Sequence, residues 1–422
     1  MAEIEPLRAL HYNLSKVGPL SEVVAPPYDV IDAAQRKELL GRSPYNVVAI
    51  DLPQSEPSGS RDPYEYAGEQ FENWQMLSAV IRDSEPAIWA HTQRYVGPDG
   101  VEQTRRGFFC RVKIEEYGPG GVRPHERTHP GPREDRLRLT RATRANMSPI
   151  FSLYSDLERA AWAALEPATQ GEPWGEATDE QGTVHKLWRV ADPQTIEAVK
   201  ASTRGKELLI ADGHHRYETA RVYAQELGGE GEHQYVLMCL VALEDPGLTV
   251  FPTHRLVKGL DSERQERLAQ ALRENFELEE VALQEIAPPA GTGRLQLGYI
   301  DAHSQRPWRL TLKDQAIADA ALAEHSEPYR HLDTGILETL LLKGALGLSD
   351  EDISHLHNFG YARDTQQAVE LVQSGAFDVA FLMRPTPVAQ VREVAQEGEN
   401  MPPKSTFFFP KLLTGLLFNP LS

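Results

Sequence analysis

The residues 207–227, ELLIADGHHRYETARVYAQEL, carry the densest group of chemically useful side chains in this sequence. An acid, a glycine, two histidines and an arginine follow one another at Asp212, Gly213, His214, His215 and Arg216. A guanidinium can bind two phosphate oxygens at once, an imidazole can donate a hydrogen bond, and a glycine lets the backbone come close to a ligand. The group therefore favours a binding corner for an anion such as a phosphate.

The flanking sequence predicts how this group is positioned. Leu208–Ala211 is typical of a short buried strand, and the apolar spacing from Tyr217 onward predicts a helix. The group is therefore expected at a strand-to-helix junction, where the first N–H groups of the helix lack internal partners and the helix dipole is positive. Alternatively, Asp212 only caps the helix and the histidines are structural. A cap needs one residue, so four consecutive polar or permissive positions favour the binding interpretation.

A second group of candidate residues lies in RPHERTHPGPREDR, residues 123–136. Glu126 could act as a general base, because a carboxylate next to a substrate hydroxyl can accept its proton. His125 and His129 could instead bind a metal ion, or the segment could be a solvated loop. We assign no metal ligand. For His214 and His215 metal binding is disfavoured, because adjacent histidines point in different directions and no HExxH or CxxC spacing includes these two residues.

A third group lies in MPPKSTFFFPK, residues 401–411. Lys404 and Ser405 are candidates for cofactor binding, because a Lys-Ser-Thr triplet resembles a phosphate-binding loop in composition. The segment lacks the glycine-rich frame of a P-loop, and for Lys404 an ordinary surface position explains the sequence equally well.

Composition limits the class of protein. The chain has 422 residues, enough for two or three domains, with 41% hydrophobic and 25% charged residues, as in an ordinary globular protein. Its net charge of −19 disfavours a broad nucleic-acid surface. Cys110 and Cys239 lie in apolar runs and are expected to be buried free thiols. No signal peptide or membrane-length apolar run is evident, so we expect a soluble cytoplasmic protein. Assembly of the chain into a homo-oligomer remains an open alternative.

The hydrophobic patterns predict an α+β fold, a mixed sheet with flanking helices. Expected elements include helices over 62–81 and 136–147 and a β-hairpin over 87–114 with Gly-Pro-Asp-Gly at its turn. We expect an N-terminal α+β domain over 1–260 that carries the phosphate corner. Residues 261–422 are expected to form a C-terminal α/β portion whose tail could return to the site.

Six motifs occur in an order that resembles the bacterial and archaeal domain-of-unknown-function 1015 family. They are APPYDVI, NVVAIDLP, HERTH followed by EDR, ADGHHRYETA, PTHRLV and MPPKSTFFFPKL. The strand–DGHHR–helix element also resembles the nucleotide-phosphate motif of the ParB/sulfiredoxin superfamily, which includes DNA-segregation CTPases, sulfiredoxin and free-serine kinases. That resemblance implies a ParB/sulfiredoxin-like core in which residues 212–216 hold nucleotide phosphates. The acidic composition and the lack of a helix-turn-helix pattern after the motif disfavour the DNA-binding branch.

The leading hypothesis is a small-molecule phosphotransferase that uses ATP or ADP with Mg²⁺ and phosphorylates serine or a similar hydroxylated metabolite. The candidate catalytic residues are Glu126, Asp212 and His215. The candidate cofactor-binding residues are Gly213, His214, Arg216, Lys404 and Ser405. Two alternatives remain: a regulator that binds CTP or ATP without turnover, and a metal-dependent phosphoester hydrolase built on His125, His129, His214 and His215.

Overall fold

The computed structural model describes residues 2–55, 59, 61–97, 100–128 and 130–422, and these form two compact units. The first unit comprises residues 1–124, 128–249 and 410–422, and the second comprises 125–127 and 250–409. The chain therefore leaves the first unit twice, at residues 125–127 and at residues 250–409. His129 lies outside the described residues.

The first unit is built around a nine-stranded mixed sheet. Its strands run in the order β6-β11-β8-β12-β5-β4-β10-β9, and β1 pairs with β5 beside this path. The β6–β11 and β8–β12 pairs are parallel and the other registered pairs are antiparallel. The strands are β1 (Ile4–Glu5), β4 (Ile88–Val96), β5 (Glu102–Lys113), β6 (Val122–Arg123), β8 (Ile150–Tyr154), β9 (Gly175–Thr178), β10 (Val184–Val190), β11 (Leu208–Asp212) and β12 (Tyr235–Ala242).

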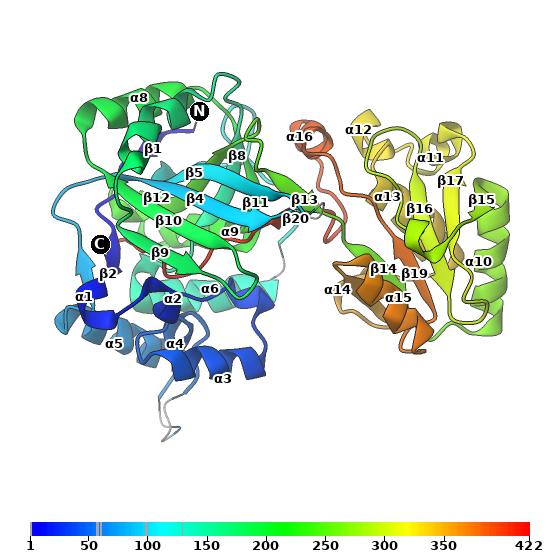
Figure 1. Cartoon of the computed structure of the whole chain (residues 1–422), viewed down its shortest axis with the longest axis horizontal. Helices are drawn as coiled ribbons and strands as arrows, with labels where there is room; N and C mark the ends of the chain where they lie inside the picture. Colours follow the sequence, from blue (N-terminus) through cyan, green and yellow to red (C-terminus); the bar gives the residue numbers. More distant parts are fainter. Residues whose placement is uncertain (1, 56–58, 60, 98–99, 129) are drawn as a thin grey trace. The chain divides into compact units, whose positions relative to one another are not determined.

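Helices flank this sheet, as Figure 1 shows with α8 on one side and α5 and α6 on the other. The helices are α1 (Leu14–Val17), α2 (Leu20–Val23), α3 (Ala33–Arg42), α4 (Val48–Asp51), α5 (Pro63–Met76), α6 (Pro130–Thr143), α7 (Ala160–Leu165), α8 (Pro193–Thr203) and α9 (His214–Leu227). The short elements are η1 (Tyr28–Val30), η2 (Glu166–Gln170), η3 (Glu232–Gln234), β2 (Leu10–Tyr12), β3 (Val80–Arg82), β7 (Ala145–Asn146) and β21 (Asn419–Pro420). Strand β13 (Thr249–Phe251) begins at the last residue before the second unit, and β20 (Phe407–Phe409) belongs to the second unit. The expected α+β class with a mixed sheet and flanking helices is confirmed.

One face of the sheet packs against α7, α8 and α9 in a single apolar core. Phe108 and Met238 of the sheet meet Leu165 of α7, Val199 of α8 and Tyr217 of α9, all buried. Because successive strand residues point to opposite faces, this leaves neighbours such as Phe109 and Cys239 on the other face. Both cysteines are buried and free, as the sequence predicts.

The expected hairpin over 87–114 is confirmed, because β4 and β5 pair antiparallel from Trp89 opposite Phe109 to Val96 opposite Glu102. Pro98 and Asp99 of its turn lie outside the described residues.

Two predicted helices end earlier than their apolar spacing indicates. The helix expected over 62–81 ends at Met76, Leu77 is 45% exposed, and strand β3 begins at Val80. The helix expected over 136–147 spans Pro130–Thr143 instead. A residue with a left-handed backbone follows each helix, Ser78 with φ 54° and Arg144 with φ 49°. Since neither is a glycine, the sequence gives little sign of the stop.

The second unit contains a six-stranded sheet in the order β15-β17-β16-β19-β14-β18, antiparallel in every registered pair. Its strands are β14 (His254–Val257), β15 (Phe276–Glu280), β16 (Gln296–Asp301), β17 (Trp308–Leu312), β18 (Phe359–Ala362) and β19 (Val379–Leu382). Its helices and turns are α10 (Ser262–Asn275), η4 (Leu283–Glu285), α11 (Gln315–Ala321), α12 (Glu327–Arg330), α13 (Asp333–Leu337), the π-helical η5 (Glu338–Ala345), α14 (Asp350–Ser354), α15 (Thr365–Gln373) and α16 (Val388–Gln396).

Helix α15 and helix α10 pack on opposite faces of that sheet. Ile300 and Ala380 point toward Val369 and Val372 of α15 in one apolar cluster. The alternate residues, such as Tyr299 and Val379, face the side where α10 lies. Across the described residues of both units, no helix combines the length and the apolarity needed to cross a bilayer.

Candidate functional site

The group at residues 212–216 lies where β11 meets α9, as expected. Gly213 has φ 103°, a left-handed conformation that glycine adopts without steric cost, and it allows the chain to turn directly from the strand into the helix. His214, His215 and Arg216 form the first turn of α9 rather than a loop before it. No side-chain hydrogen bond caps the start of this helix, where the positive end of the helix dipole favours an anion.

Asp212 holds two cations at this corner. Its Oδ2 lies 3.1 Å from the Lys411 Nζ and 3.7 Å from the Arg216 Nη2. Burial alone would raise the pKa of Asp212, but Lys411 and then Arg216 outweigh it and hold the pKa below the ordinary value for an aspartate. The carboxylate is therefore ionised at neutral pH and serves as the shared counter-ion of both cations.

The remaining residues of the motif are partly enclosed. His214 is buried with 4% exposure, whereas the side chains of His215 and Arg216 are half-buried. Arg216 also donates through Nη1 to the carbonyl oxygen of Pro149. The guanidinium is thus oriented by its own chain on one side and by Asp212 on the other.

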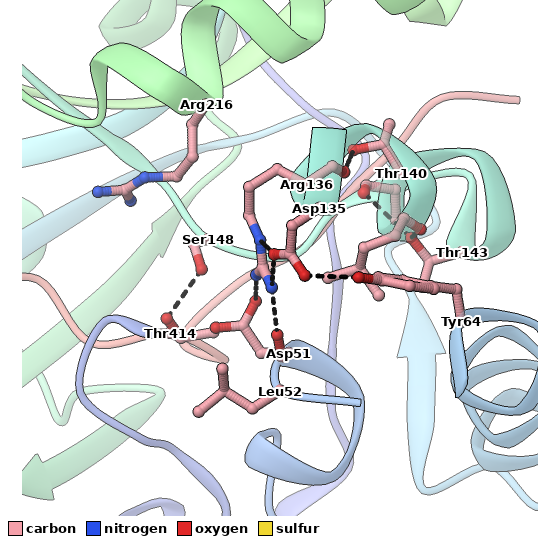
Figure 2. A network of polar contacts seen from close by, with 12 residues as sticks. Asp51, Leu52, Tyr64, Asp135, Arg136, Thr140, Thr143, Ser148, Arg216 and Thr414 are labelled. Carbon is pink, nitrogen blue, oxygen red and sulfur yellow. Dashed lines mark hydrogen bonds and ion pairs between the residues drawn. The ribbon is translucent and has the colours of Figure 1, made fainter. Parts of the chain in front are cut away.

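A second cationic group, Arg136, lies in the neighbouring network that Figure 2 shows. Its Nη1 donates to Asp51 Oδ1 and its Nη2 to the Asp51 carbonyl oxygen, both at 2.8 Å, and its Nε donates to Asp135 Oδ2 at 2.7 Å. Tyr64 donates to the other Asp135 oxygen at 2.6 Å. The Arg136 guanidinium also lies 4.1 Å from the centre of the Tyr28 ring. Arg136 is therefore held by the carboxylates of Asp51 and Asp135, by the Asp51 carbonyl oxygen and by the face of the Tyr28 ring.

The electrostatics of this network reflect its burial. Asp51 is 2% exposed, and burial raises its pKa even though Arg136 and Arg216 act in the opposite direction. Its Oδ2 is buried and has no hydrogen-bond partner among the described residues. Burial likewise raises the pKa of Tyr28 to about 12, against the same two arginines. Removing any one of these charges would leave another buried and uncompensated.

Arg216 and Arg136 line one small cavity of about 30 Å³, together with Asp51, Ser148 and Thr219. Figure 2 shows Arg216 extending from α9 toward Ser148. The volume admits water but is far below the ~300–1,000 Å³ of small-molecule pockets. A nucleotide phosphate therefore needs movement of the side chains in its wall.

Four motifs that are distant in sequence come together here. Tyr28 comes from APPYDVI, Asp51 from NVVAIDLP, Arg136 from EDR and Arg216 from ADGHHRYETA. Sequence reasoning noted these motifs but did not select Tyr28, Asp51, Arg136 or Lys411 as site residues. The charged residue inside each motif was the available sign of a functional role. The spacing of the motifs in the sequence does not show which of these residues meet in the fold.

The other predicted residues lie in the second unit. Ser405 is buried, its hydroxyl donates to the Pro402 carbonyl oxygen at 2.7 Å, and it lies 2.8 Å from the Thr334 hydroxyl. Lys404 is exposed and has a left-handed backbone with φ 56°. Arg255 donates to the carbonyl oxygens of Pro403 and Lys404, at 3.1 and 3.2 Å. The turn is thus held rigidly, with Lys404 at its exposed tip.

The HER motif adjoins the same turn. His125 Nε2 lies 2.9 Å from the Thr406 hydroxyl, and the Met401 N–H donates to the His125 carbonyl oxygen at 2.8 Å. Glu126 follows and is half-buried. Its charge acts on Arg255 and Tyr361. Glu126, Lys404 and Ser405 therefore belong to one cluster inside the second unit, whereas residues 212–216 and Lys411 form the cluster of the first unit.

Within the residues that the structure describes, no group of three or more histidine, cysteine, aspartate or glutamate side chains is placed to hold a metal ion. The alternative built on His125 and His129 is not tested, because His129 lies outside those residues.

A family model described as "Protein of unknown function (DUF1015)" matches residues 4–372. The chain belongs to this family. A search of curated proteins gave no significant match. Among solved structures, the chain is similar to a conserved hypothetical protein from Pyrococcus furiosus, with 16% identity, TM-score 0.34, and coverage of 68% of this chain and 86% of that one.

Free serine kinase structures are also similar to it. A variant in complex with AMP matches with 15% identity and TM-score 0.36, and a variant in complex with ADP matches with 14% identity and TM-score 0.36. Each match covers 68% of this chain and 83% of the kinase. AMP and ADP are ligands of those proteins.

Proposed function

We propose that the protein is a small-molecule phosphotransferase that transfers a phosphoryl group from ATP or ADP to the hydroxyl of a metabolite such as serine. The observation that supports this proposal most directly is the ion triad of Asp212, Lys411 and Arg216 at the start of α9. Two cations at the positive end of a helix dipole suit a polyphosphate, because phosphoryl transfer depends mostly on positioning and charge neutralisation. The proposal keeps the ParB/sulfiredoxin-like assignment of the DGHHR element and a cytoplasmic location.

Each residue has a role in the proposal. Arg216 and Lys411 bind phosphate oxygens, His214 and His215 donate hydrogen bonds, and Gly213 allows the close approach of the phosphate. Ser405 holds the shape of its turn, since its hydroxyl is engaged within the second unit.

Mg²⁺ in such sites is held by one or two carboxylates together with substrate phosphates and waters, and Asp212 offers one such carboxylate. When bound, the ion would neutralise charge on the phosphates.

In the proposed reaction the metabolite hydroxyl oxygen forms a bond to the terminal phosphorus of the nucleotide. The bond from that phosphorus to the bridging oxygen breaks, and the shortened nucleotide leaves with the electron pair. The hydroxyl proton passes to a carboxylate that acts as the general base.

The test is a ³¹P NMR assay of the full chain with Mg²⁺, ATP or ADP, and a panel of hydroxylated metabolites that begins with serine. We expect a phosphomonoester product, and Lys411→Met should weaken ADP binding by about 10- to 100-fold, the value of one hydrogen bond to a charged group. Lys186→Met is the matched control, because Lys186 is a half-buried lysine in the same unit that pairs with Glu176 away from the corner.

The outcomes separate the alternatives. Nucleotide binding that depends on Lys411 but yields no product across the panel would identify the non-catalytic regulator instead, and binding of CTP should then be measured. If neither ATP, ADP nor CTP binds, the proposed site is wrong. Product formation that persists in Lys411→Met with unchanged ADP affinity would also contradict the assignment of the corner.

A further inference from the structure

The second unit contains a large cavity on the α10 side of its sheet, and none of the residues that line it belongs to the motifs above. Its volume is about 560 Å³, within the usual range for small-molecule pockets. Leu268 and Leu272 of α10 form one wall, and Tyr299, Trp308 and Val379 of the sheet form the other. Each of these residues belongs to the second unit.

The cavity exists because α10 does not fully cover the sheet near its edge strand β15. Tyr299 and Trp308 are directly opposite each other on β16 and β17, so their rings line the same surface of the sheet. Leu278 on β15 also lines the cavity and stays 40% exposed, although it is a large apolar side chain. A wedge with two aromatic rings and an incompletely covered leucine is suited to a flat apolar group.

Two carboxylates lie at the same end of this wedge. Asp301 ends β16 and is opposite Val379, and Asp378 immediately precedes Val379 on the adjacent strand. Both acids line the cavity and both are half-buried. They therefore set a negative potential beside the apolar surface, in a position where solvent screens it less than on an open surface.

Hydrogen bonds orient these carboxylates and leave acceptor capacity on each. Asp301 accepts from the Ser304 N–H and from the Ser304 hydroxyl, both at 2.7 Å. Asp378 Oδ2 accepts from the Leu260 N–H at 2.8 Å. Because each carboxylate oxygen can accept two hydrogen bonds, a ligand donor can be added without breaking these contacts. Arg273 and His303 also line the cavity but are exposed, so solvent screens their charge more strongly.

We propose that this cavity is a binding site for a small aromatic amine, whose ring fills the wedge between α10 and the sheet and whose ammonium group binds Asp301 and Asp378. The class follows from the lining: aromatic and aliphatic walls accept a planar ring, and two oriented carboxylates accept a cationic donor. The site is independent of the proposed phosphoryl transfer, because it shares no residue with the clusters assigned to that reaction.

Three matched probes test the proposal by isothermal titration calorimetry on the full chain: tryptamine, neutral indole, and the anion indole-3-acetate. Tryptamine should bind at least about tenfold more tightly than indole, and indole-3-acetate should bind more weakly than indole. Asp301→Asn and Asp378→Asn should each weaken tryptamine by about tenfold and leave indole unchanged. Glu263→Gln is the control, since Glu263 is an exposed acid on the same helix outside the cavity.

The side-chain N–H resonance of Trp308, assigned with Trp308→Phe, locates the site in the unmodified protein. It should shift on addition of tryptamine, whatever the stability of any variant. The proposal is overturned if no probe binds and this resonance does not move. Equal affinity for tryptamine and indole-3-acetate, or tryptamine affinity that is unchanged in both asparagine variants, would overturn it as well.

Discussion

At the scale of single residues, the corner of the first unit is organised by one acid rather than by its basic side chains. Asp212 lies between Lys411 and Arg216 and keeps both near the start of α9. An internal carboxylate thus lies where the proposed ligand would bring negative charge. A phosphate that binds here therefore shares both cations with the Asp212 carboxylate.

Gly213→Ala tests how tightly the backbone of this corner is constrained. The φ of 103° is strained for any residue with a Cβ, and the added Cβ would lie 3.0 Å from the Arg216 Nε and 3.1 Å from its Cζ. We expect a loss of about 1–2 kcal/mol in the free energy of unfolding, and weaker ADP binding because Arg216 is displaced. Urea unfolding and calorimetry measure the two effects.

Gly228→Ala is the matched control for that prediction. Gly228 ends the same helix with φ 61°, and a Cβ there would meet nothing within 4 Å. Backbone strain is therefore common to both variants, whereas displacement of Arg216 is specific to position 213. Equal ADP affinity in the two variants would show that Arg216 does not act in binding.

At the scale of elements, strands β4 and β10 bury a pair of histidines between them. His91 Nε2 lies 3.4 Å from His185 Nδ1, His91 Nδ1 lies 3.9 Å from Cys239 Sγ, and His185 Nε2 lies 3.6 Å from Asp179 Oδ2. Burial lowers the pKa of both histidines. His185 and Arg105 lower the pKa of His91 further, whereas Asp179 partly offsets the effect of burial at His185. Both rings are therefore neutral at neutral pH.

This pair predicts loss of stability in acid. The folded-state pKa lies below the unfolded value of about 6.5, so the unfolded chain takes up protons first as the pH falls below that value. The first unit should therefore be most stable above about pH 6.5 and lose stability steadily below it. His91→Gln should reduce this dependence, as measured by hydrogen exchange of β4 and β10 amides at pH 7.5 and 5.5. His355→Gln, at an exposed position in the second unit, should leave it unchanged.

The local elements could be predicted from sequence because local patterns encode them. The strand–glycine–helix junction at Asp212, the β4–β5 hairpin and the buried thiols follow from apolar spacing and turn residues. Partners that meet through the tertiary fold could not be predicted in this way. Lys411 is 199 residues from Asp212, and only the folded chain brings them together. Helix ends at Ser78 and Arg144 were missed because residues other than glycine adopt the left-handed stop.

At the scale of the whole molecule, the first unit is discontinuous in sequence. Residues 410–422 belong to it although 250–409 form the second unit. Leu412, Leu413, Leu416, Leu417 and Phe418 of this final segment are all buried. The Phe418 N–H and carbonyl pair with Leu10, and Thr414 pairs with Ala25 in the same way.

Removal of residues 410–422 should therefore unfold the first unit and spare the second. Five buried apolar side chains contribute about 8–15 kcal/mol, as much as the ~5–15 kcal/mol of a typical domain. Hydrogen exchange by mass spectrometry should show lost protection in β4, β5 and β12, with protection retained in β16 and β19. Removal of Ser422 alone, which is exposed, serves as the control. Retained protection in β5 would contradict this account of the segment.

The same discontinuity affects the order of events during synthesis. A ribosome makes Asp212 about two hundred residues before Lys411, and residues 250–409 of the second unit are translated in between. A nascent chain halted anywhere within that interval contains Asp212 and Arg216 but not yet Lys411. The ion triad of Asp212, Arg216 and Lys411 thus forms only after residue 411 has emerged, so an interrupted translation product lacks one of the two cations of the proposed phosphate site.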